Sequence, residues 1–283
     1  MPSPTLHPAA YTALVDLALR EDLGPEGVDL TTAWLVPAQA QATATIIARR
    51  PGVVAGLEVA GAVFNKISPQ TSCTPRVEDG AALLPGQVLL ELAGPARAIL
   101  TGERTALNFL QRLSGIATLT RQFVDAAAGR LVVLDTRKTT PLLRVFEKYA
   151  VRAGGGSNHR NGLDDGILIK DNHVRLAGGV VEAVTRMKKF SREMPTEVEV
   201  QSLDEVNGAL EAGADILLLD NMSTPDIIEA VRRCQGRART EISGGVTLAR
   251  MPELAATGAD YVSIGALTHS APAIDLSVDI EPA

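Results

Sequence analysis

Six short apolar runs in the second half of the chain constrain its fold more than any other feature. Each has a polar, charged or glycine residue at or next to its end, and helical stretches separate most of them; the runs are residues 131–136, 166–171, 197–201, 215–221, 240–245 and 261–266. Strands that alternate with helices are typical of parallel βαβ units. We therefore predict an α/β barrel, whose chemistry lies at the C-terminal ends of its strands. The alternative is an open doubly wound sheet, but residues 131–141 lack the GxGxxG turn expected after its first strand.

The first hundred residues mix short helical and strand patterns without the regular alternation of the second half, which predicts a separate α+β module. Residues 8–22 carry apolar side chains at helical spacing, and residues 43–48 and 53–56 have the pattern of strands. Residues 78–96 form a turn-rich β segment that is faintly similar to lipoyl or biotinyl carrier domains. No lysine for attachment occurs from residue 67 to residue 130, so we interpret this segment as structural.

The connection between the two halves is expected to be helical. Residues 96–128 have a helical pattern, with a break predicted at Ser114 and Gly115. Residues 273–280 alternate in polarity and are expected to return as a strand to the first module. The predicted domains are therefore residues 1–115 with a return strand in 270–283, and residues 116–269.

Composition limits the possible partners. A net charge of −6 over 283 residues argues against broad attraction to nucleic acid or to an anionic membrane surface. Any site for acidic ligands must therefore be local. No signal-peptide pattern and no run of roughly 18 apolar residues occurs, so we expect a cytoplasmic protein. Cys73 and Cys234 belong to no disulfide framework or metal-binding spacing and predict two buried thiols.

Residues 135–175 concentrate positive charge. The cations are Arg137, Lys138, Arg144, Lys148, Arg152, Arg160, Lys170 and Arg175, against the acids Asp135, Glu147, Asp164, Asp165 and Asp171. Arg144, Lys148 and Arg152 follow helical spacing, so we expect them on a solvated helix face. The cations at strand ends or beside the glycine run 154–156 are not expected in a helix, so a solvated helix face does not explain them. Arginine binds carboxylates through paired hydrogen bonds, and lysine binds phosphate as a point charge, so these cations predict a ligand with several negative groups. The glycine run is expected to position His159 and Arg160 over that ligand.

The acids and glycines of the later strands suggest two further features. Glu197 and Glu199 alternate with valines and so share one face of a strand. Asp220 ends the next strand, where it and a glutamate could hold Mg²⁺; a hydrogen-bonded network inside the barrel is the alternative. The SGG loop (243–245) and the IGA loop (264–266) close the last two strands, a common place for a phosphate site in barrels.

Taken together, these motifs closely resemble the quinolinate phosphoribosyltransferase family. The resemblance runs from Glu21 to Ile280 and rests on residues 135–173 and 103–118 together with the EVEV, LLLDN, ISGG and IGALTHS motifs. It implies an N-terminal α/β sandwich domain and an incomplete α/β barrel. It also implies a homodimer with shared active sites, and leaves open whether dimers assemble into hexamers. The family converts quinolinate and phosphoribosyl pyrophosphate into nicotinate mononucleotide, pyrophosphate and CO₂ in de novo NAD synthesis.

The resemblance also implies a role for each residue that matches the family's motifs. Quinolinate carboxylates are assigned to Arg137, His159 and Arg160, with Arg104 contributed by the neighbouring subunit. Lys138 and Lys170 are placed between quinolinate and the pyrophosphate, and Glu199 and Asp220 at the Mg²⁺ ion and the ribose. The 5-phosphate is assigned to Ser243, Gly244, Gly245 and Gly265. Lys138, Lys170, Glu199 and Asp220 are thereby implied as catalytic.

Two other hypotheses remain open. A paralogue associated with molybdate transport shares the fold, but the intact NHRNGLDDGILIKDNH motif (158–173) argues against it. A barrel lyase could form a Schiff base at Lys170, a strand-end lysine. That mechanism gives Arg137, His159 and Arg160 no role unless its substrate is also polyanionic.

Overall fold

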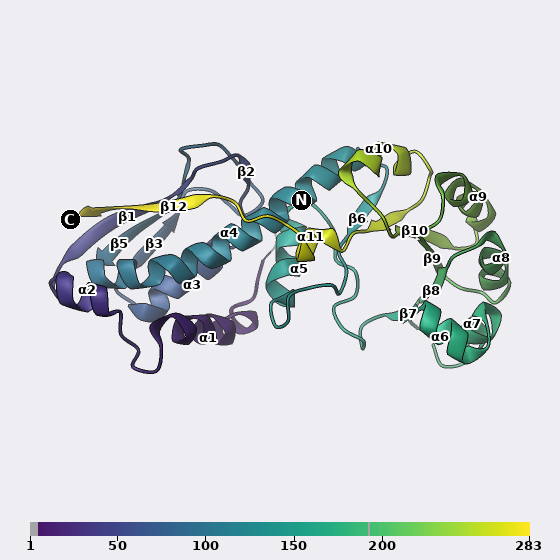
Figure 1. Ribbon diagram of the computed structural model, residues 1–283, viewed down its shortest axis with the longest axis horizontal. Helices are drawn as coiled ribbons and strands as arrows, with labels where there is room; N and C mark the ends of the chain where they lie inside the picture. Colours follow the sequence, from purple (N-terminus) through teal and green to yellow (C-terminus); the bar gives the residue numbers. More distant parts are fainter. Residues whose placement is uncertain (1–4, 192) are drawn as a thin grey trace. The chain divides into compact units, whose positions relative to one another are not determined.

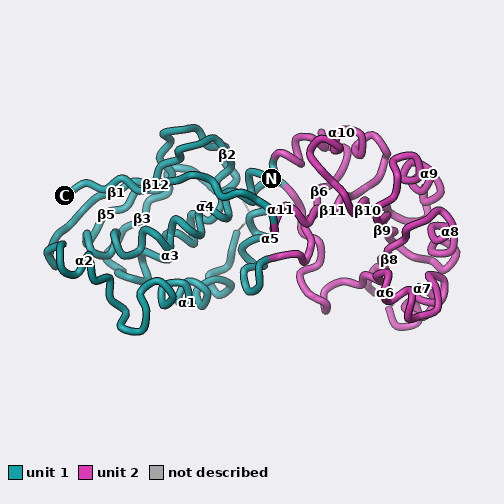
Figure 2. Tube along the Cα trace, in the orientation of Figure 1, with its two compact units in different colours: residues 1–121, 140–155, 270–283 teal, residues 122–139, 156–269 magenta. Residues whose placement is uncertain are grey.

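The computed structural model describes residues 5–191 and 193–283, and the chain divides into two compact units. Unit 1 comprises residues 1–121, 140–155 and 270–283, and unit 2 comprises residues 122–139 and 156–269 (Figure 2). The segment 140–155, which we expected in the barrel domain, therefore groups with unit 1. Among the described residues, no helix combines the length and apolar character needed to cross a membrane.

Unit 1 is an α+β module built on an antiparallel sheet. Its helices are η1 (Pro8–Ala10), α1 (Thr12–Leu23), α2 (Leu30–Leu35), α3 (Leu57–Ile67), α5 (Arg144–Ala153) and most of α4 (Ala96–Ala127). Its strands are β1 (Gln41–Ala48), β2 (Gly52–Val53), β3 (Ser72–Pro75), β4 (Ala82–Leu83), β5 (Val88–Pro95) and β12 (Leu276–Pro282). Four of them form a sheet in the order β12-β1-β5-β3, and β2 pairs with β4. The antiparallel pairing of β12 with β1 confirms the predicted return strand.

The core of unit 1 follows from the alternation in β1. Every second residue of this strand is buried, and Ile46 is fully enclosed. Helix α3 contributes Phe64, also fully enclosed, which contacts α4 at Gly102. Burying side chains of this size stabilises a fold by about 1.5–3 kcal/mol each. Figure 1 shows α3 and α4 running alongside the sheet.

Helix α4 is continuous from Ala96 to Ala127, so the predicted break at Ser114 and Gly115 is wrong. Gly115 serves close packing instead: a Cβ atom there would lie 2.0 Å from the carbonyl oxygen of Pro272. Ser114 is buried and accepts a hydrogen bond from the Ala55 amide at 3.1 Å. Both residues therefore fit the helix to its neighbours within unit 1.

Unit 2 is an α/β unit with a parallel sheet. Its strands are β6 (Val132–Leu134), β7 (Ile167–Ile169), β8 (Thr196–Val200), β9 (Ile216–Asp220), β10 (Arg239–Ser243) and β11 (Tyr261–Ser263). Its helices are α6 (Asp171–Ala177), α7 (Val180–Lys188), α8 (Leu203–Glu211), α9 (Thr224–Cys234), η2 (Leu248–Arg250), α10 (Met251–Leu254) and α11 (Ala266–His269). All six predicted strands are confirmed, and every pairing between them is parallel.

The strand order identifies the sheet as barrel-like rather than doubly wound. Strands β7 to β11 follow one another in chain order, and β6, the first, pairs with β11, the last. In a sheet of this order the last strand in the chain lies beside the first, as it does in an α/β barrel. In the described part of the chain, no ladder joins β6 to β7, so the barrel is incomplete there; Ser157 forms a single bridge to Leu134 beside this gap. Helices α7, α8 and α9 cover the outer side of the strands (Figure 1).

Helix α5 corrects a second expectation. Its cations were predicted on a solvated face, but Lys148 is only 3% exposed and Arg144 is half-buried, whereas Arg152 is exposed. The helix buries nearly its whole length within unit 1, and Phe146 packs against Phe109 of α4 with ring centroids 5.2 Å apart. This packing explains why residues 140–155 group with unit 1.

Candidate active site

A cavity of about 510 Å³ lies at the C-terminal ends of the unit 2 strands. All six strands contribute to its lining, either by a residue within the strand or by one in the loop that follows. The structure brings together the predicted residues Arg137, Lys138, His159, Arg160, Lys170, Glu199, Asp220 and Ser243. The geometry therefore matches the rule that a barrel carries its site at this edge.

A larger cavity, of about 600 Å³, lies within unit 1 but is less suited to chemistry. Several of its charged residues are already paired or bonded to the backbone: Lys66 lies 2.9 Å from Asp16. Arg97 donates to the carbonyl oxygens of Val36 and Ala33 at 2.8 and 3.0 Å. Volume alone therefore does not identify the site.

The cations of the unit 2 cavity are arranged to hold an anion. Arg160 donates to the Gly166 carbonyl at 2.9 Å. Partial burial, and then the nearby charge of Arg137, lower the pKa of Arg160 below its usual value. The Nε atom of Arg137 is buried and has no hydrogen-bond partner among the described residues. Two guanidinium groups that repel each other, one with an unsatisfied donor, favour a bound carboxylate between them.

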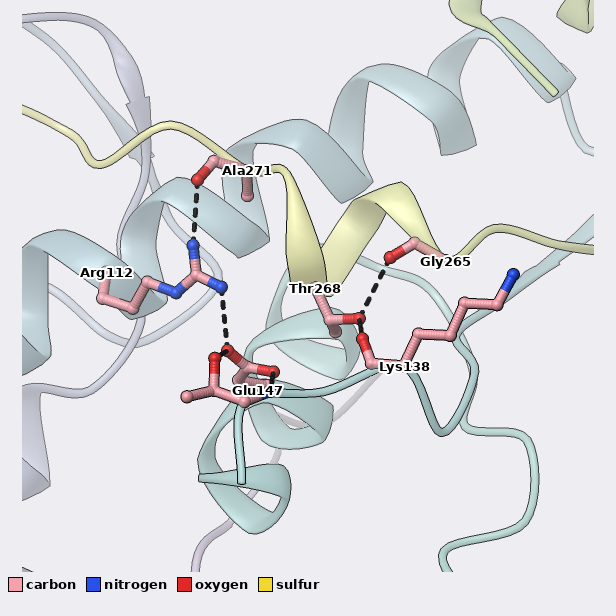
Figure 3. Close-up of polar contacts among 7 residues, drawn as sticks. Arg112, Lys138, Glu147, Gly265, Thr268 and Ala271 are labelled. Atoms are coloured by element: carbon pink, nitrogen blue, oxygen red, sulfur yellow. Dashed lines mark hydrogen bonds and ion pairs between the residues drawn. The ribbon is translucent and has the colours of Figure 1, made fainter. Parts of the chain in front are cut away.

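The loops that carry these cations are anchored through their backbones. The Asp135 side chain is fully buried and accepts hydrogen bonds from Asn158 and from the His159 amide, the latter at 2.9 Å. The carbonyl oxygen of Lys138 accepts from the Thr268 hydroxyl at 2.8 Å, and Thr268 also donates to Gly265 at 3.1 Å (Figure 3). The Lys138 amine itself is left exposed at the cavity.

The two predicted metal ligands line the same cavity. Burial, and then the nearby charges of Asp220 and Asp171, raise the pKa of Glu199 above its usual value, while Lys170 opposes the shift. Asp220 accepts hydrogen bonds from Asn221 at 2.9 Å and from Gln201 at 3.4 Å. Clustered carboxylates that repel one another are relieved by a cation, and oxygen ligands suit Mg²⁺. The donor set of Glu199 and Asp220 thus fits the predicted ion.

The predicted glycines have backbone conformations or neighbours that disfavour a side chain. Gly244 has φ of +86°, and a Cβ atom there would lie 2.1 Å from Oδ1 of Asn221. Gly245 also has a positive φ, of +60°. A Cβ atom on Gly265 would lie 2.9 Å from Cδ of Lys138. The backbone therefore favours glycine at 244 and 245, whereas at 265 a side chain would displace Lys138. The phosphate-binding role of these loops remains a prediction.

Two residues need separate mention. Arg104 lies on α4 in unit 1 and is exposed, so its predicted role in a neighbouring subunit's site remains a prediction. Glu241 of β10 lines the cavity but was missed from the sequence, where an acid within the short apolar strand 239–243 was the available signal. It is 2% exposed and lies near His159.

Comparison with known proteins shows the family and agrees with the fold. Residues 29–114 match the family model described as the quinolinate phosphoribosyl transferase N-terminal domain, and residues 116–279 match the C-terminal domain. The chain is 45% identical over 269 residues to the nicotinate-nucleotide pyrophosphorylase [carboxylating] of Mycobacterium leprae, covering 93% of this chain and 94% of that protein. It is 41% identical over 262 residues to a probable enzyme of the same name from Bacillus subtilis, covering 92% and 90%.

Solved structures give the same result. The structure of NadC from Streptococcus pyogenes superposes with a TM-score of 0.95 at 41% identity, covering 99% of each chain. The nicotinate-nucleotide pyrophosphorylase from Francisella tularensis superposes with a TM-score of 0.93 at 40% identity, covering 98% of each chain. This chain belongs to the quinolinate phosphoribosyltransferase family.

Proposed function

We propose that the unit 2 cavity transfers a phosphoribosyl group from phosphoribosyl pyrophosphate to quinolinate, with loss of CO₂, giving nicotinate mononucleotide and pyrophosphate. One observation carries the proposal: arginines, lysines and carboxylates converge on a single cavity at the strand ends. The substrates together carry carboxylates, a phosphate and a pyrophosphate, which need positive groups. The reacting ribose needs negative groups close by.

Quinolinate would bind at the arginine side of the cavity. Arg137 and Arg160 lie close enough that their charges interact, and Arg137 has a buried donor without a partner among the described residues. A dicarboxylate can satisfy both guanidinium groups with paired hydrogen bonds. Binding would thus relieve the repulsion between them.

Phosphoribosyl pyrophosphate would bind where the acids and lysines meet. Lys138 and Lys170 reach the leaving pyrophosphate, and Glu199 and Asp220 hold the ribose hydroxyls. We propose that the same two carboxylates also serve Mg²⁺, which when bound would neutralise pyrophosphate oxygens. The glycine loops at 243–245 and 265 would offer backbone amides to the 5-phosphate.

The charge pattern suits the reaction. Loss of pyrophosphate gives the ribose ring oxocarbenium character, so positive charge grows on the ring and negative charge on the leaving group. Preorganised carboxylates stabilise the first and lysines the second. After the bond to nitrogen forms, loss of CO₂ leaves the electron pair of the broken bond on the pyridine carbon that carried it, where the quaternised nitrogen and the nearby arginines stabilise it. A proton from water then takes the place of the lost CO₂. No protein nucleophile is needed.

We further propose a homodimer with shared sites, in which Arg104 of one subunit reaches the quinolinate pocket of its partner. The exposed position of Arg104 on α4 supports this. The assembly of dimers into hexamers stays an open question. A cytoplasmic location stays a prediction, and one relative, from rice, is named chloroplastic.

A Schiff-base lyase fits the cavity less well. Lys170 is exposed and acts on Glu199 as a nearby positive charge. Lysines that form Schiff bases are usually desolvated or placed beside another cation. Borohydride in the presence of candidate carbonyl substrates would trap a covalent adduct only if the lyase hypothesis holds.

Substrate choice tests the proposed function. A site with half-buried cations for two carboxylates should reject nicotinate, because the missing carboxylate leaves one of those cations unpaired. We expect kcat/KM for quinolinate to exceed that for nicotinate by on the order of a thousandfold or more. Comparable values for the two acids would overturn the proposal.

A further inference from the structure

Three buried or half-buried side chains form a cluster inside the unit 2 barrel. Glu197 of β8 and Glu241 of β10 are 5% and 2% exposed. The Nε2 atom of His159 lies 3.2 Å from Glu197 Oε2 and 3.6 Å from Glu241 Oε2. His159 and Glu241 line both the proposed active-site cavity and a second cavity of about 420 Å³. The cluster therefore forms part of the wall between the two cavities.

The hydrogen bonds of His159 decide which ring nitrogen carries the proton. The amide of Arg160 donates to Nδ1 of His159 at 2.8 Å, so Nδ1 uses its lone pair as an acceptor. In a neutral imidazole the proton then lies on Nε2, which faces Glu197. A metal ligand would need the lone pair on Nε2, so these three side chains do not fit a metal site, although their ligand atoms lie within 4.8 Å of one another.

The two carboxyl groups also interact with each other. Burial, and then the negative charge of Glu197, raise the pKa of Glu241 to about 7, while His159 opposes the shift. Glu197 has the carboxylate oxygen nearer to Nε2 of His159, at 3.2 Å against 3.6 Å for Glu241, so Glu197 is the acceptor for the Nε2 proton.

We propose that Glu197 and Glu241 are positioning residues, which hold His159 by its Nε2–H group and so orient the His159–Arg160 segment toward quinolinate. Arg160 is the next residue, and its amide is bonded to the same ring, so rotation of the ring disturbs the Arg160 backbone. A hydrogen bond from His159 to a substrate would have to replace one of these two contacts. The inference about quinolinate rests on the proposed function, whereas the tautomer of His159 does not.

The tautomer can be measured without any substrate. Proteins labelled with ¹⁵N-histidine give separate ring signals for the chain's 4 histidines, and His159→Gln identifies the signal of interest. We expect the neutral Nε2–H form for His159 at neutral pH. An Nδ1–H form or an imidazolium would overturn the proposal even if the enzyme is fully active on quinolinate.

Variants then test the positioning role. Glu197→Leu removes the acceptor, whereas Glu197→Gln keeps an oxygen in the same place; Glu211→Gln, an exposed carboxylate at the end of α8, is the control. We expect the leucine variant to raise the KM for quinolinate about tenfold or more, with the KM for phosphoribosyl pyrophosphate changed by less than about threefold. The glutamine variant should recover most of the loss.

A rise of both KM values together, or a normal KM for quinolinate in a folded leucine variant, would overturn the positioning role. If the leucine variant does not fold, the glutamine variant decides: it must keep the Nε2–H tautomer and a quinolinate KM close to that of the wild type. Absence of activity in every protein, with the Nε2–H tautomer present in the wild type, would count against the proposed function instead.

Discussion

Breaking one buried ion pair in unit 1 should cost far more stability than breaking an exposed one. Glu147 has a side chain with 0% exposure, and its Oε1 atom lies 2.8 Å from Arg112. Thr140 also donates to Glu147, through its amide at 3.0 Å and its hydroxyl at 2.9 Å. Arg112 in turn donates to the Ala271 carbonyl at 2.9 Å (Figure 3). Arg112→Met would leave a buried carboxylate without its counter-ion.

The expected magnitude follows from burial. Removing one partner of a buried ion pair costs about 3–5 kcal/mol, and we take the lower end, about 3 kcal/mol, because Arg112 is 30% exposed and Thr140 remains as a donor. For a protein of this size 1 kcal/mol shifts the Tm by about 2–4 °C, which predicts a fall of roughly 6–12 °C. Arg76→Met breaks the exposed pair with Glu91 and should leave the Tm unchanged.

A double-mutant cycle in urea, with thermal scans alongside, provides the assay. Glu147→Gln removes the charge but keeps an acceptor for Thr140. The double variant with Arg112→Met should be more stable than the sum of the single effects predicts, by about 0.5–3 kcal/mol. Additive effects, or a loss in Arg112→Met no larger than in Arg76→Met, would refute the argument that this pair stabilises unit 1.

Further expectations concern the active site and pH. Asp220→Ala should abolish most turnover while the Tm stays near that of the wild type; normal turnover with a lowered Tm would instead favour a structural carboxylate. Arg104→Ala should weaken quinolinate binding by roughly 2–5 kcal/mol with the dimer intact, and mixing it with Lys138→Ala should restore about a quarter of wild-type activity per subunit. No recovery despite proven subunit exchange would place Arg104 within its own chain's site. Because the folded pKa of Glu241 is raised from 4.5 to about 7, its contribution to stability is present below pH 4.5 and lost as the pH rises through 7. Urea unfolding across this range should therefore show a smaller decline for Glu241→Gln, and identical pH profiles would contradict the shift.

Local patterns in the sequence predicted the strands of unit 2 well and those of unit 1 only in part. The strand expected at residues 53–56 overlaps β2 only at Val53, and β3 was not predicted. The six apolar runs of unit 2 fall on its six strands, and the alternating run at 273–280 overlaps β12 and pairs with β1. Short apolar runs and alternating polarity reflect which side chains of a strand are buried, so these patterns coincide with strands in the structure. The placement of chemistry at strand ends followed from the barrel architecture, and a cavity lined by the predicted residues lies at these ends.

The errors arose where tertiary contacts overrode local signals. Gly115 looks like a helix break, but its role is a close approach to the Pro272 backbone, more than 150 residues away in the chain. Lys148 has the spacing of a solvated face, yet α5 is enclosed by unit 1. Glu241 gave only a weak signal, because one acid in a short strand does not show which neighbouring strand carries its partner. Such pairings depend on distances that a linear pattern does not contain.

The most direct test of the account is the stoichiometry of the wild-type reaction. Purified protein, quinolinate labelled with ¹⁴C in its 2-carboxylate, phosphoribosyl pyrophosphate and Mg²⁺ should yield labelled CO₂, pyrophosphate and nicotinate mononucleotide in equal amounts. Lys138→Ala should yield almost none. Release of CO₂ without nucleotide, or nucleotide that retains both carboxylates, would contradict the central claim.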